Sequence, residues 1–258
     1  MALHLAITIQ KLRLASCAGL SFLWAGSALL AEDASPQPGK DTKPAAEAAA
    51  TPQPVDVYLG RRVAQTMHWS GSSWLIRHER DRQEATKLMR QQLDLKPGMM
   101  VCDMGCGNGY HTLPMAEAVA PTGKVYGVEI QPQMLKMLSE RADAKGVKNI
   151  VQVLGEPYDP KLPAATLDLI VCVDVYHEFS YPEQMLAGMR KALKPDGKIV
   201  MVEFRSEDDE VPIKPEHKMS KEQVNKELTA NGFKLVKQFD GLPWQHMMWF
   251  GLDEGWKK

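Results

Sequence analysis

Apolar and polar positions form blocks of two kinds along the middle of this chain. Short and almost wholly apolar runs, such as residues 99–102 and 167–174, have the pattern of strands buried on both faces of a parallel sheet. Between them, segments such as residues 132–145 carry apolar residues three or four positions apart, as on one face of a helix. This alternation predicts an α/β fold with a Rossmann-like, doubly wound and mostly parallel sheet.

The same patterns set the expected order of elements. The helix at 132–145 begins with Pro132, which suits a first helical turn, and a capping box of Ser220 and Gln223 opens another helix that ends before Gly232. The predicted strands are residues 99–102, 124–129, 149–154, 167–174, 198–204, 233–239 and 245–252, and the predicted helices are residues 110–119, 132–145, 181–193 and 220–231.

A cover of residues 55–95 is expected in front of the first strand. We predict a short helix at 58–67, a turn at 69–74, and a helix at 78–93 whose apolar residues share one face. Lys96, Pro97 and Gly98 then break the chain.

Alternating glycines follow the first strand directly. Val101 to Gly109 reads Val-Cys-Asp-Met-Gly-Cys-Gly-Asn-Gly, and a helical pattern comes next. Glycine has no Cβ, so such a loop can turn sharply and bring its backbone against a ligand. The spacing fails the dinucleotide fingerprint G-x-G-x-x-G, because its third glycine would fall on Tyr110 or Thr112.

The pattern Asp-x-Gly-x-Gly-x-Gly resembles motif I of the class I S-adenosylmethionine-dependent methyltransferases. A second acid, Glu129, ends the next strand about twenty residues later, where a ribose-binding carboxylate is expected. The resemblance covers residues 95–252. It implies a seven-stranded sheet that closes with an antiparallel hairpin, formed by residues 233–239 and 245–252.

The resemblance also implies S-adenosylmethionine as cofactor, with the glycine loop against its methionine part. Glu156 would face the adenine amino group, although the sequence alone equally allows a loop carboxylate. Trp69 and Trp74 are candidates for a lid over the cofactor, or for core aromatics that anchor the leading helix. The expected cofactor-binding residues are Asp103, Gly105, Cys106, Gly107, Gly109, Tyr110, Glu129, Ile130, Glu156 and Asp174.

The fourth strand ends in Asp-Val-Tyr-His-Glu-Phe, beside the first strand in a doubly wound sheet. His177 and Glu178 are therefore the candidate catalytic residues: imidazole titrates near neutral pH, and Glu178 could orient it or bind an amine. The alternative for His177 is a structural hydrogen bond. Weaker substrate-site candidates are His217, Lys218, Trp244 and His246.

Charge and motifs argue against a nucleic-acid partner. They leave a small molecule, a quinone- or lipid-like compound or a peptide side chain open, and we expect a small-molecule acceptor. Lys plus Arg number 31 against 32 Asp plus Glu, so no basic field favours nucleic acid. An Asn-Pro-Pro-Tyr motif is missing after the fourth strand, which argues against methylation of amino groups on bases or glutamine. No spacing of His and Cys predicts a structural metal, and Cys102 and Cys172 fit small core residues.

The first 54 residues differ in composition from the rest. Lys11 and Arg13 precede an uncharged apolar stretch that ends in small residues, which predicts a signal peptide at 1–31, or else an uncleaved membrane anchor. Residues 32–54 are rich in Pro and Ala and predict a disordered linker. The domain at 55–258 is thus expected to be exported, and a subgroup of exported bacterial methyltransferase-like proteins has similar motifs.

Export leaves a second hypothesis open, since the cofactor is made in the cytoplasm. The domain could hold S-adenosylmethionine or a related nucleoside without turnover. The intact glycine loop, Glu129 and the polar end of the fourth strand favour the enzyme.

Overall fold

A computed structural model describes residues 51–257. The predicted signal peptide and most of the predicted linker lie outside the described residues. Residues 51–55 have no regular secondary structure, although the Val55 N–H donates to the Ser180 carbonyl at 2.8 Å. Among the described residues, no helix combines the length and the apolar character needed to cross a bilayer.

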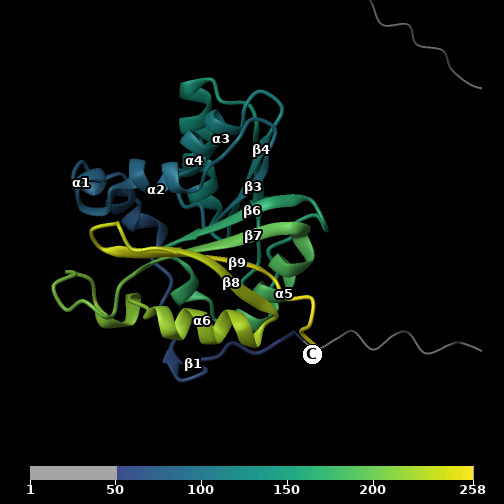
Figure 1. Ribbon diagram of the computed structural model, residues 1–258. Coiled ribbons are helices and arrows are strands. Elements are labelled where there is room, and N and C mark those ends of the chain that lie inside the picture. Colours follow the sequence, from purple (N-terminus) through teal and green to yellow (C-terminus); the bar gives the residue numbers. More distant parts are fainter. Residues whose placement is uncertain (1–50, 258) are drawn as a thin grey trace, which may run out of the picture. The chain divides into compact units, whose positions relative to one another are not determined.

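The centre of the domain is a seven-stranded sheet with the order β5-β4-β3-β6-β7-β9-β8 (Figure 1). Its first five strands in sequence, β3 to β7, are parallel, and β9 runs antiparallel to both β7 and β8. The strands are β3 (Met100–Met104), β4 (Lys124–Glu129), β5 (Ile150–Leu154), β6 (Leu167–Val173), β7 (Leu193–Phe204), β8 (Phe233–Phe239) and β9 (Gln245–Leu252). This confirms the predicted fold class and the closing hairpin.

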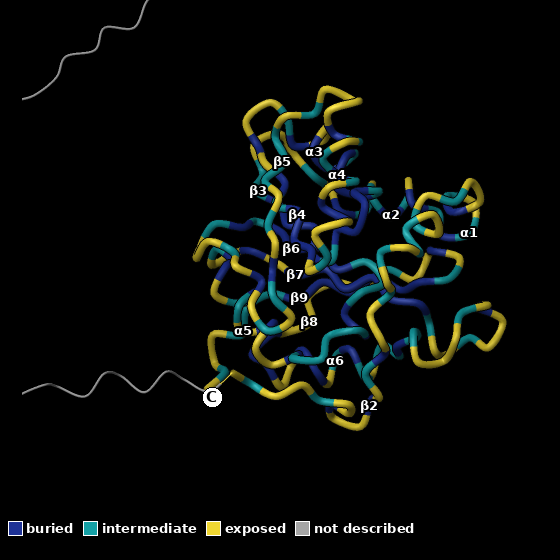
Figure 2. Tube along the Cα trace, turned by 180° about the vertical axis from the view of Figure 1, so that it is seen from behind, coloured by how far each residue is buried: buried dark blue, intermediate teal, exposed yellow. Residues whose placement is uncertain are grey.

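Helices cover both faces of this sheet, as Figure 1 shows. The helices on one face are α2 (Thr86–Gln92), α3 (Thr112–Val119) and α4 (Pro132–Lys145). Those on the other face are α5 (Pro182–Ala192) and α6 (Lys221–Ala230). The strands therefore need apolar side chains on both faces, which explains why β6 reads as a continuous apolar run. Figure 2 shows the buried centre of the sheet and its exposed loops.

The covering segment differs from its prediction in two places. Residues 58–67 contain no helix: β1 (Val57–Tyr58) and β2 (Arg61–Arg62) form a small hairpin. Leu59 and Gly60 make its turn with positive φ angles of 47° and 97°. The helix expected at 78–93 is two helices, α1 (Arg80–Glu84) and α2, because Ala85 adopts a left-handed φ of 48°.

Short 3₁₀ turns replace other expected loops. The segment expected to turn at 69–74 is η1 (Trp69–Ile76), while η2 (Tyr176–Glu178) follows β6 and η3 (Pro215–His217) follows β7. The Ser220 hydroxyl caps α6 by accepting the Gln223 N–H at 3.1 Å, which confirms the N-cap half of the predicted box. The Gln223 side-chain amide donates to Glu227 and to the Leu59 carbonyl.

Candidate functional site

A cavity of about 630 Å³ lies at the carboxyl ends of the parallel strands, where the order reverses between β3 and β6. Two groups of residues predicted from the sequence share its walls. One surrounds the glycine loop, and the other follows β6. The predicted site residues on this wall are Gly105, Gly107, Glu129, Ile130, Glu156, Asp174, His177 and Glu178.

The glycine loop fits into its place only because its glycines have no side chain. A Cβ on Gly105 would lie 2.3 Å from Val175 Cγ2, and one on Gly107 would lie 2.7 Å from Leu75 Cδ1. Both glycines also have positive φ angles, 69° and 51°. Only bare backbone therefore fits between these neighbours and the cavity, as a closely held ligand requires.

Backbone donors hold the Glu129 carboxylate in place beside this loop. Its Oε1 accepts the N–H groups of Ile130 at 2.8 Å and Gln131 at 2.9 Å, and its Oε2 accepts the Gly107 N–H at 3.1 Å. Burial raises the pKa of Glu129, and these three hydrogen bonds partly offset that effect. The carboxylate is thus oriented, and its remaining lone pairs can accept hydrogen bonds from two neighbouring hydroxyls.

Asp174 supplies an unpartnered acceptor on the same wall. Its Oδ2 accepts the Gln245 side-chain amide at 3.2 Å, but its buried Oδ1 has no hydrogen-bond partner among residues 51–257. Burial, followed by the charges of Glu84 and Glu203, raises the pKa of Asp174 well above its usual value. A ligand ammonium or hydroxyl would satisfy this oxygen, so the residue fits a cofactor with an amino-acid part.

Glu156 lies at the outer part of the wall. It pairs with Lys161, whose ammonium lowers the pKa of the carboxyl by hydrogen bonding. The carboxylate is charged and accessible, which suits a hydrogen bond to a ligand but does not select one.

Four predicted cofactor residues are not on the cavity wall: Asp103, Cys106, Gly109 and Tyr110. Asp103 is buried below the loop, where it accepts the Thr112 hydroxyl at 2.6 Å, and burial raises its pKa to about 6. Cys106 is buried against the Cβ position of Gly127, and Gly109 packs against Leu138. The Arg80 guanidinium stacks 4.5 Å from the centre of the Tyr110 ring. These residues support the loop from behind.

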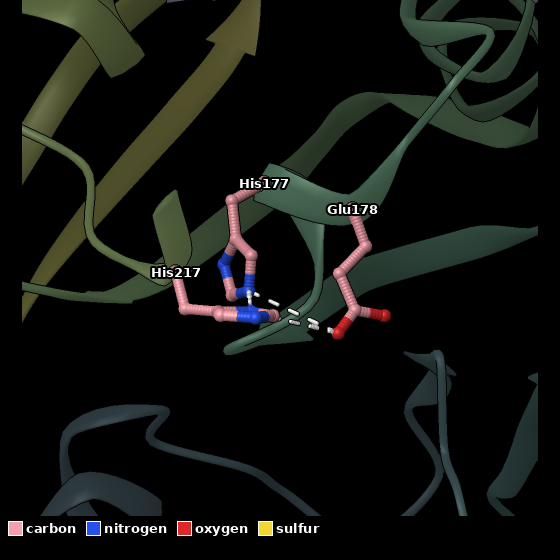
Figure 3. A group of neighbouring side chains, drawn as sticks. All are labelled: His177, Glu178 and His217. Atoms are coloured by element: carbon pink, nitrogen blue, oxygen red, sulfur yellow. Dashed lines mark hydrogen bonds and ion pairs between the residues drawn. The ribbon is translucent and has the colours of Figure 1, made fainter. Parts of the chain in front are cut away.

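His177 occupies the other end of the cavity. Its Nδ1–H donates to Glu203 Oε2 at 2.6 Å, and its Nε2 lies 3.1 Å from Nδ1 of His217 (Figure 3). Burial lowers the pKa of His177, but the charge and hydrogen bond of Glu203 outweigh burial, so the pKa is raised overall. Burial lowers the pKa of His217, and so does the neighbouring His177.

Glu178 completes this cluster. Its Oε1 lies 4.0 Å from His177 Nε2 and 4.0 Å from His217 Nδ1, and burial raises its pKa to about 7. Of the weaker candidates, His217 joins the cluster, whereas buried His246 binds the Met219 carbonyl at 2.9 Å and Lys218 binds the Asp208 carbonyl at 3.0 Å. The cavity wall includes none of His246, Lys218 and Trp244.

The segment around η1 forms one side of the cavity. The Gln131 side chain accepts the Trp69 N–H at 2.8 Å and donates to the Met67 carbonyl at 2.9 Å, and Asn108 Nδ2 donates to the Ser72 carbonyl at 3.0 Å. Trp74 lines the cavity, whereas Trp69 does not. Neither tryptophan is buried, so the segment is a cover rather than a core anchor.

Sequence reasoning missed several residues of the site. Glu203 was visible as an acid at the end of a predicted strand, but nothing in the sequence paired it with His177. Arg80 and Glu84 line the cavity from α1, where they form an ion pair at 2.8 Å, and no sequence pattern predicted either residue at the site.

Comparisons with known proteins agree with this geometry. A family model described as a methyltransferase domain matches residues 95–251. Nocamycin O-methyltransferase of Saccharothrix syringae is 33% identical over 113 residues, which are 43% of this chain and 40% of that protein. Demethylmenaquinone methyltransferase of Bacillus mycoides is 28% identical over 127 residues, 49% of this chain and 52% of that protein. The chain thus spans about half or less of the length of these relatives.

A solved structure of similar fold has been described as a SAM-dependent methyltransferase from Aquifex aeolicus. The two chains superimpose with a TM-score of 0.68 at 23% identity, over 72% of this chain and 100% of the other. At this identity the likeness concerns the fold alone.

Proposed function

This chain belongs to the class I S-adenosylmethionine-dependent methyltransferases, and we propose that it transfers a methyl group to a small-molecule acceptor bound beside His177. The observation that carries the proposal is that one cavity of about 630 Å³ joins the glycine loop and Glu129 to the cluster around His177. A donor and an acceptor can therefore lie in contact, as in-line displacement requires.

The first end of the cavity fits the cofactor of the family. The bare backbone of Gly105 and Gly107 allows close approach, and Glu129 can accept hydrogen bonds from ribose hydroxyls. Asp174 Oδ1 can accept a hydrogen bond from the amino group of the methionine part of the cofactor. Glu156 can accept one from the adenine amino group. When bound, S-adenosylmethionine supplies an electrophilic methyl group on a sulfonium.

The second end fits an acceptor that loses a proton. Glu203 accepts the Nδ1–H of His177, which leaves the Nε2 lone pair facing the cluster at the cavity wall. We assign His177 Nε2 as the group that receives the acceptor proton, and Glu178 as the carboxylate that orients the acceptor. The lone pair of the acceptor atom then forms the new bond to carbon, while the electron pair of the broken bond stays on sulfur.

The acceptor end also limits the class of substrate. Apolar side chains of Phe179, Phe204 and Ile213 share the wall with the polar cluster, which suits a small molecule with an apolar body and one reacting heteroatom. The near-balanced charge of the chain gives no support for a nucleic acid.

Isothermal titration of the full chain with S-adenosylmethionine and S-adenosylhomocysteine tests the cofactor end. We expect saturable binding of both, and the absence of heat with either would contradict the proposal. Methyl release is then followed with a panel of phenols, other alcohols, quinone-like compounds and carboxylates. Binding of both nucleosides without transfer to any of them would instead indicate a non-catalytic binding domain.

We also propose that the domain acts outside the cytoplasm. Support comes from the two cations, Lys11 and Arg13, in front of an uncharged stretch at 14–31. Fractionation of cells that express the full chain, with sequencing of the mature amino terminus, tests this. We expect cleavage after Ala31 and a chain in the exported fraction, and an intact chain in the cytosol would refute the proposal.

A further inference from the structure

Three metal-binding side chains meet at the acceptor end of the cavity. Figure 3 shows that His177 and Glu178 come from η2 and that His217 reaches the same point from η3. Their nearest ligand atoms lie within 4.8 Å of one another, and all three residues line the cavity. His177 and Glu178 are adjacent, but His217 lies 40 positions after His177, so no sequence spacing predicts that the three meet.

The distances suit a single ion. A triangle with sides of 3.1, 4.0 and 4.0 Å has a point about 2.2 Å from each corner. Zinc lies about 2.0–2.1 Å from imidazole nitrogen and about 2.0–2.2 Å from carboxylate oxygen. Small side-chain shifts therefore allow the ion to stand slightly out of the plane and keep open positions toward the cavity.

A second observation, independent of these distances, is the orientation of His177. Its Nδ1–H donates to the buried carboxylate of Glu203 at 2.6 Å, and the other oxygen of Glu203 accepts the Tyr176 N–H at 3.0 Å. A metal-binding histidine almost always donates its second ring N–H to such a partner, which fixes the ring and its tautomer. Here the arrangement directs the Nε2 lone pair of His177 at His217 and Glu178.

We propose that His177 Nε2, His217 Nδ1 and Glu178 bind one divalent transition-metal ion, with zinc as the best fit. Two imidazoles and one carboxylate favour zinc, iron, cobalt or nickel over magnesium or calcium, which prefer oxygen ligands. The three protein ligands leave at least one coordination position free for an oxygen of the acceptor.

A bound ion would allow the acceptor hydroxyl to lose its proton without a protein base. This step rests on the proposed function. Coordination lowers the pKa of the hydroxyl, so that its proton passes to water and the oxygen keeps its electron pair. That pair forms the O–C bond, and the electrons of the S–C bond remain on sulfur. With the ion bound, His177 Nε2 is a ligand and the ion replaces it as the agent of deprotonation. Without the ion, His177 Nε2 receives the proton, as in the proposed function.

Zinc titration of the full chain after dialysis against a chelator tests the proposal. We expect one equivalent to bind by calorimetry and elemental analysis, with magnesium unable to compete. Cobalt in place of zinc should give the visible absorption bands of a four- or five-coordinate nitrogen and oxygen site. His217→Ala and Glu178→Gln should each weaken zinc binding at least 10-fold, and Glu203→Gln, a positioning change, should weaken it about 10- to 100-fold.

His78→Ala removes an exposed histidine of the described chain and is the matched control, with zinc affinity unchanged. Retention of the wild-type zinc affinity in both His217→Ala and Glu178→Gln would overturn the proposal, as would the absence of a stoichiometric site. The nucleoside titrations keep the two proposals apart. Nucleoside binding without zinc binding overturns the metal site alone, and zinc binding without nucleoside binding supports the metal site and refutes the cofactor.

Discussion

At the scale of single residues, the carboxylates near the cavity differ in what surrounds them. Glu129 is oriented by three backbone N–H groups, Asp174 keeps one oxygen without a partner in the described chain, and Asp103 is buried against Thr112. All three lie at or next to the carboxyl end of a strand, so the strand pattern alone does not separate a ligand-binding acid from a supporting one. Their surroundings determine which acid can meet a ligand.

Replacement of Glu129 by Gln tests the ribose role. The amide keeps the shape of the side chain but removes the charge and one acceptor, so we expect S-adenosylmethionine to bind about 1–3 kcal/mol more weakly. Calorimetry measures the difference. Glu117→Gln makes the same chemical change at an exposed position on α3 and should leave binding unaltered. Equal affinity of the Glu129→Gln variant and the wild type would remove Glu129 from the cofactor site.

The raised pKa of Asp103 predicts that the stability of the cofactor-free protein depends on pH. Burial raises its pKa in the folded protein to about 6, while the unfolded chain has a value near 3.8. The folded state therefore holds this proton more tightly, and its contribution to the free energy of unfolding falls as pH rises from about 4 to about 6, by up to about 3 kcal/mol.

Urea unfolding of the wild type and of Asp103→Asn at pH 4.5, 5.5 and 7 measures this contribution. Because the variant cannot ionise, its stability relative to the wild type should increase across the series. A constant difference between the two proteins would show that the folded pKa of Asp103 is not raised.

The sequence predicted the members of the site correctly where a local stretch of chain determines their geometry. Gly105, Gly107 and Glu129 are fixed by one strand–loop–helix unit and the next strand, and both are readable in the sequence. His217 and Glu203 meet His177 only through the pairing of β6 with β7 and the path of the loop that follows. Such contacts join distant segments, and no local pattern specifies them.

At the scale of elements, the predictions succeeded where apolar periodicity decides the structure. The helix at 132–145 and the strands at 233–239 and 245–252 have the bounds that the sequence predicts. Residues 58–67 were predicted wrongly, because the β1–β2 hairpin depends on the turn at Gly60 and on contacts of Arg61 with α6. The break between α1 and α2 at Ala85 has no signal of its own in the helical pattern.

Contact between the glycine loop and the segment after β6 can be tested with two matched alanines. Gly105 and Gly146 have nearly equal φ angles, 69° and 68°. A Cβ on Gly146 meets nothing within 4 Å, whereas one on Gly105 meets Val175 at 2.3 Å. Gly146→Ala should therefore cost about 1–2 kcal/mol of stability for its backbone alone.

Gly105→Ala should cost about 1–3 kcal/mol more than Gly146→Ala, because Val175 has to move. Denaturant unfolding without cofactor compares the two variants. Equal losses would show that the loop and Val175 are not in firm contact.

At the scale of the whole domain, a buried ion pair joins three regions far apart in sequence. Arg61 of the hairpin binds Glu227 of α6 at 2.7 Å and donates to the His177 carbonyl at 2.8 Å. The Tyr176 hydroxyl donates to the same glutamate at 2.7 Å. The covering segment is thus connected through the Arg61 guanidinium to α6 and to the backbone of the candidate catalytic residue.

Arg61→Ala leaves Glu227 buried without its cation, so we expect a loss of about 3–5 kcal/mol in the free energy of unfolding. Arg62→Ala, at the exposed neighbouring position, should change it by no more than about 0.5 kcal/mol. Thermal and urea unfolding give both values. Similar small losses of stability in the two variants would mean that the Arg61–Glu227 ion pair does not hold the β1–β2 hairpin against α6.

The hydrogen bonds between the side chains of Gln131 and Asn108 and the backbone of residues 67–72 have a kinetic consequence. We call residues 67–72 the strap. If the nucleoside product binds beneath the strap, it leaves only after these hydrogen bonds break. Product release could then be no faster than the opening of the strap, and the residence time of the nucleoside would measure that opening. Such a domain retains its cofactor through brief dilution, a useful property wherever that cofactor is scarce.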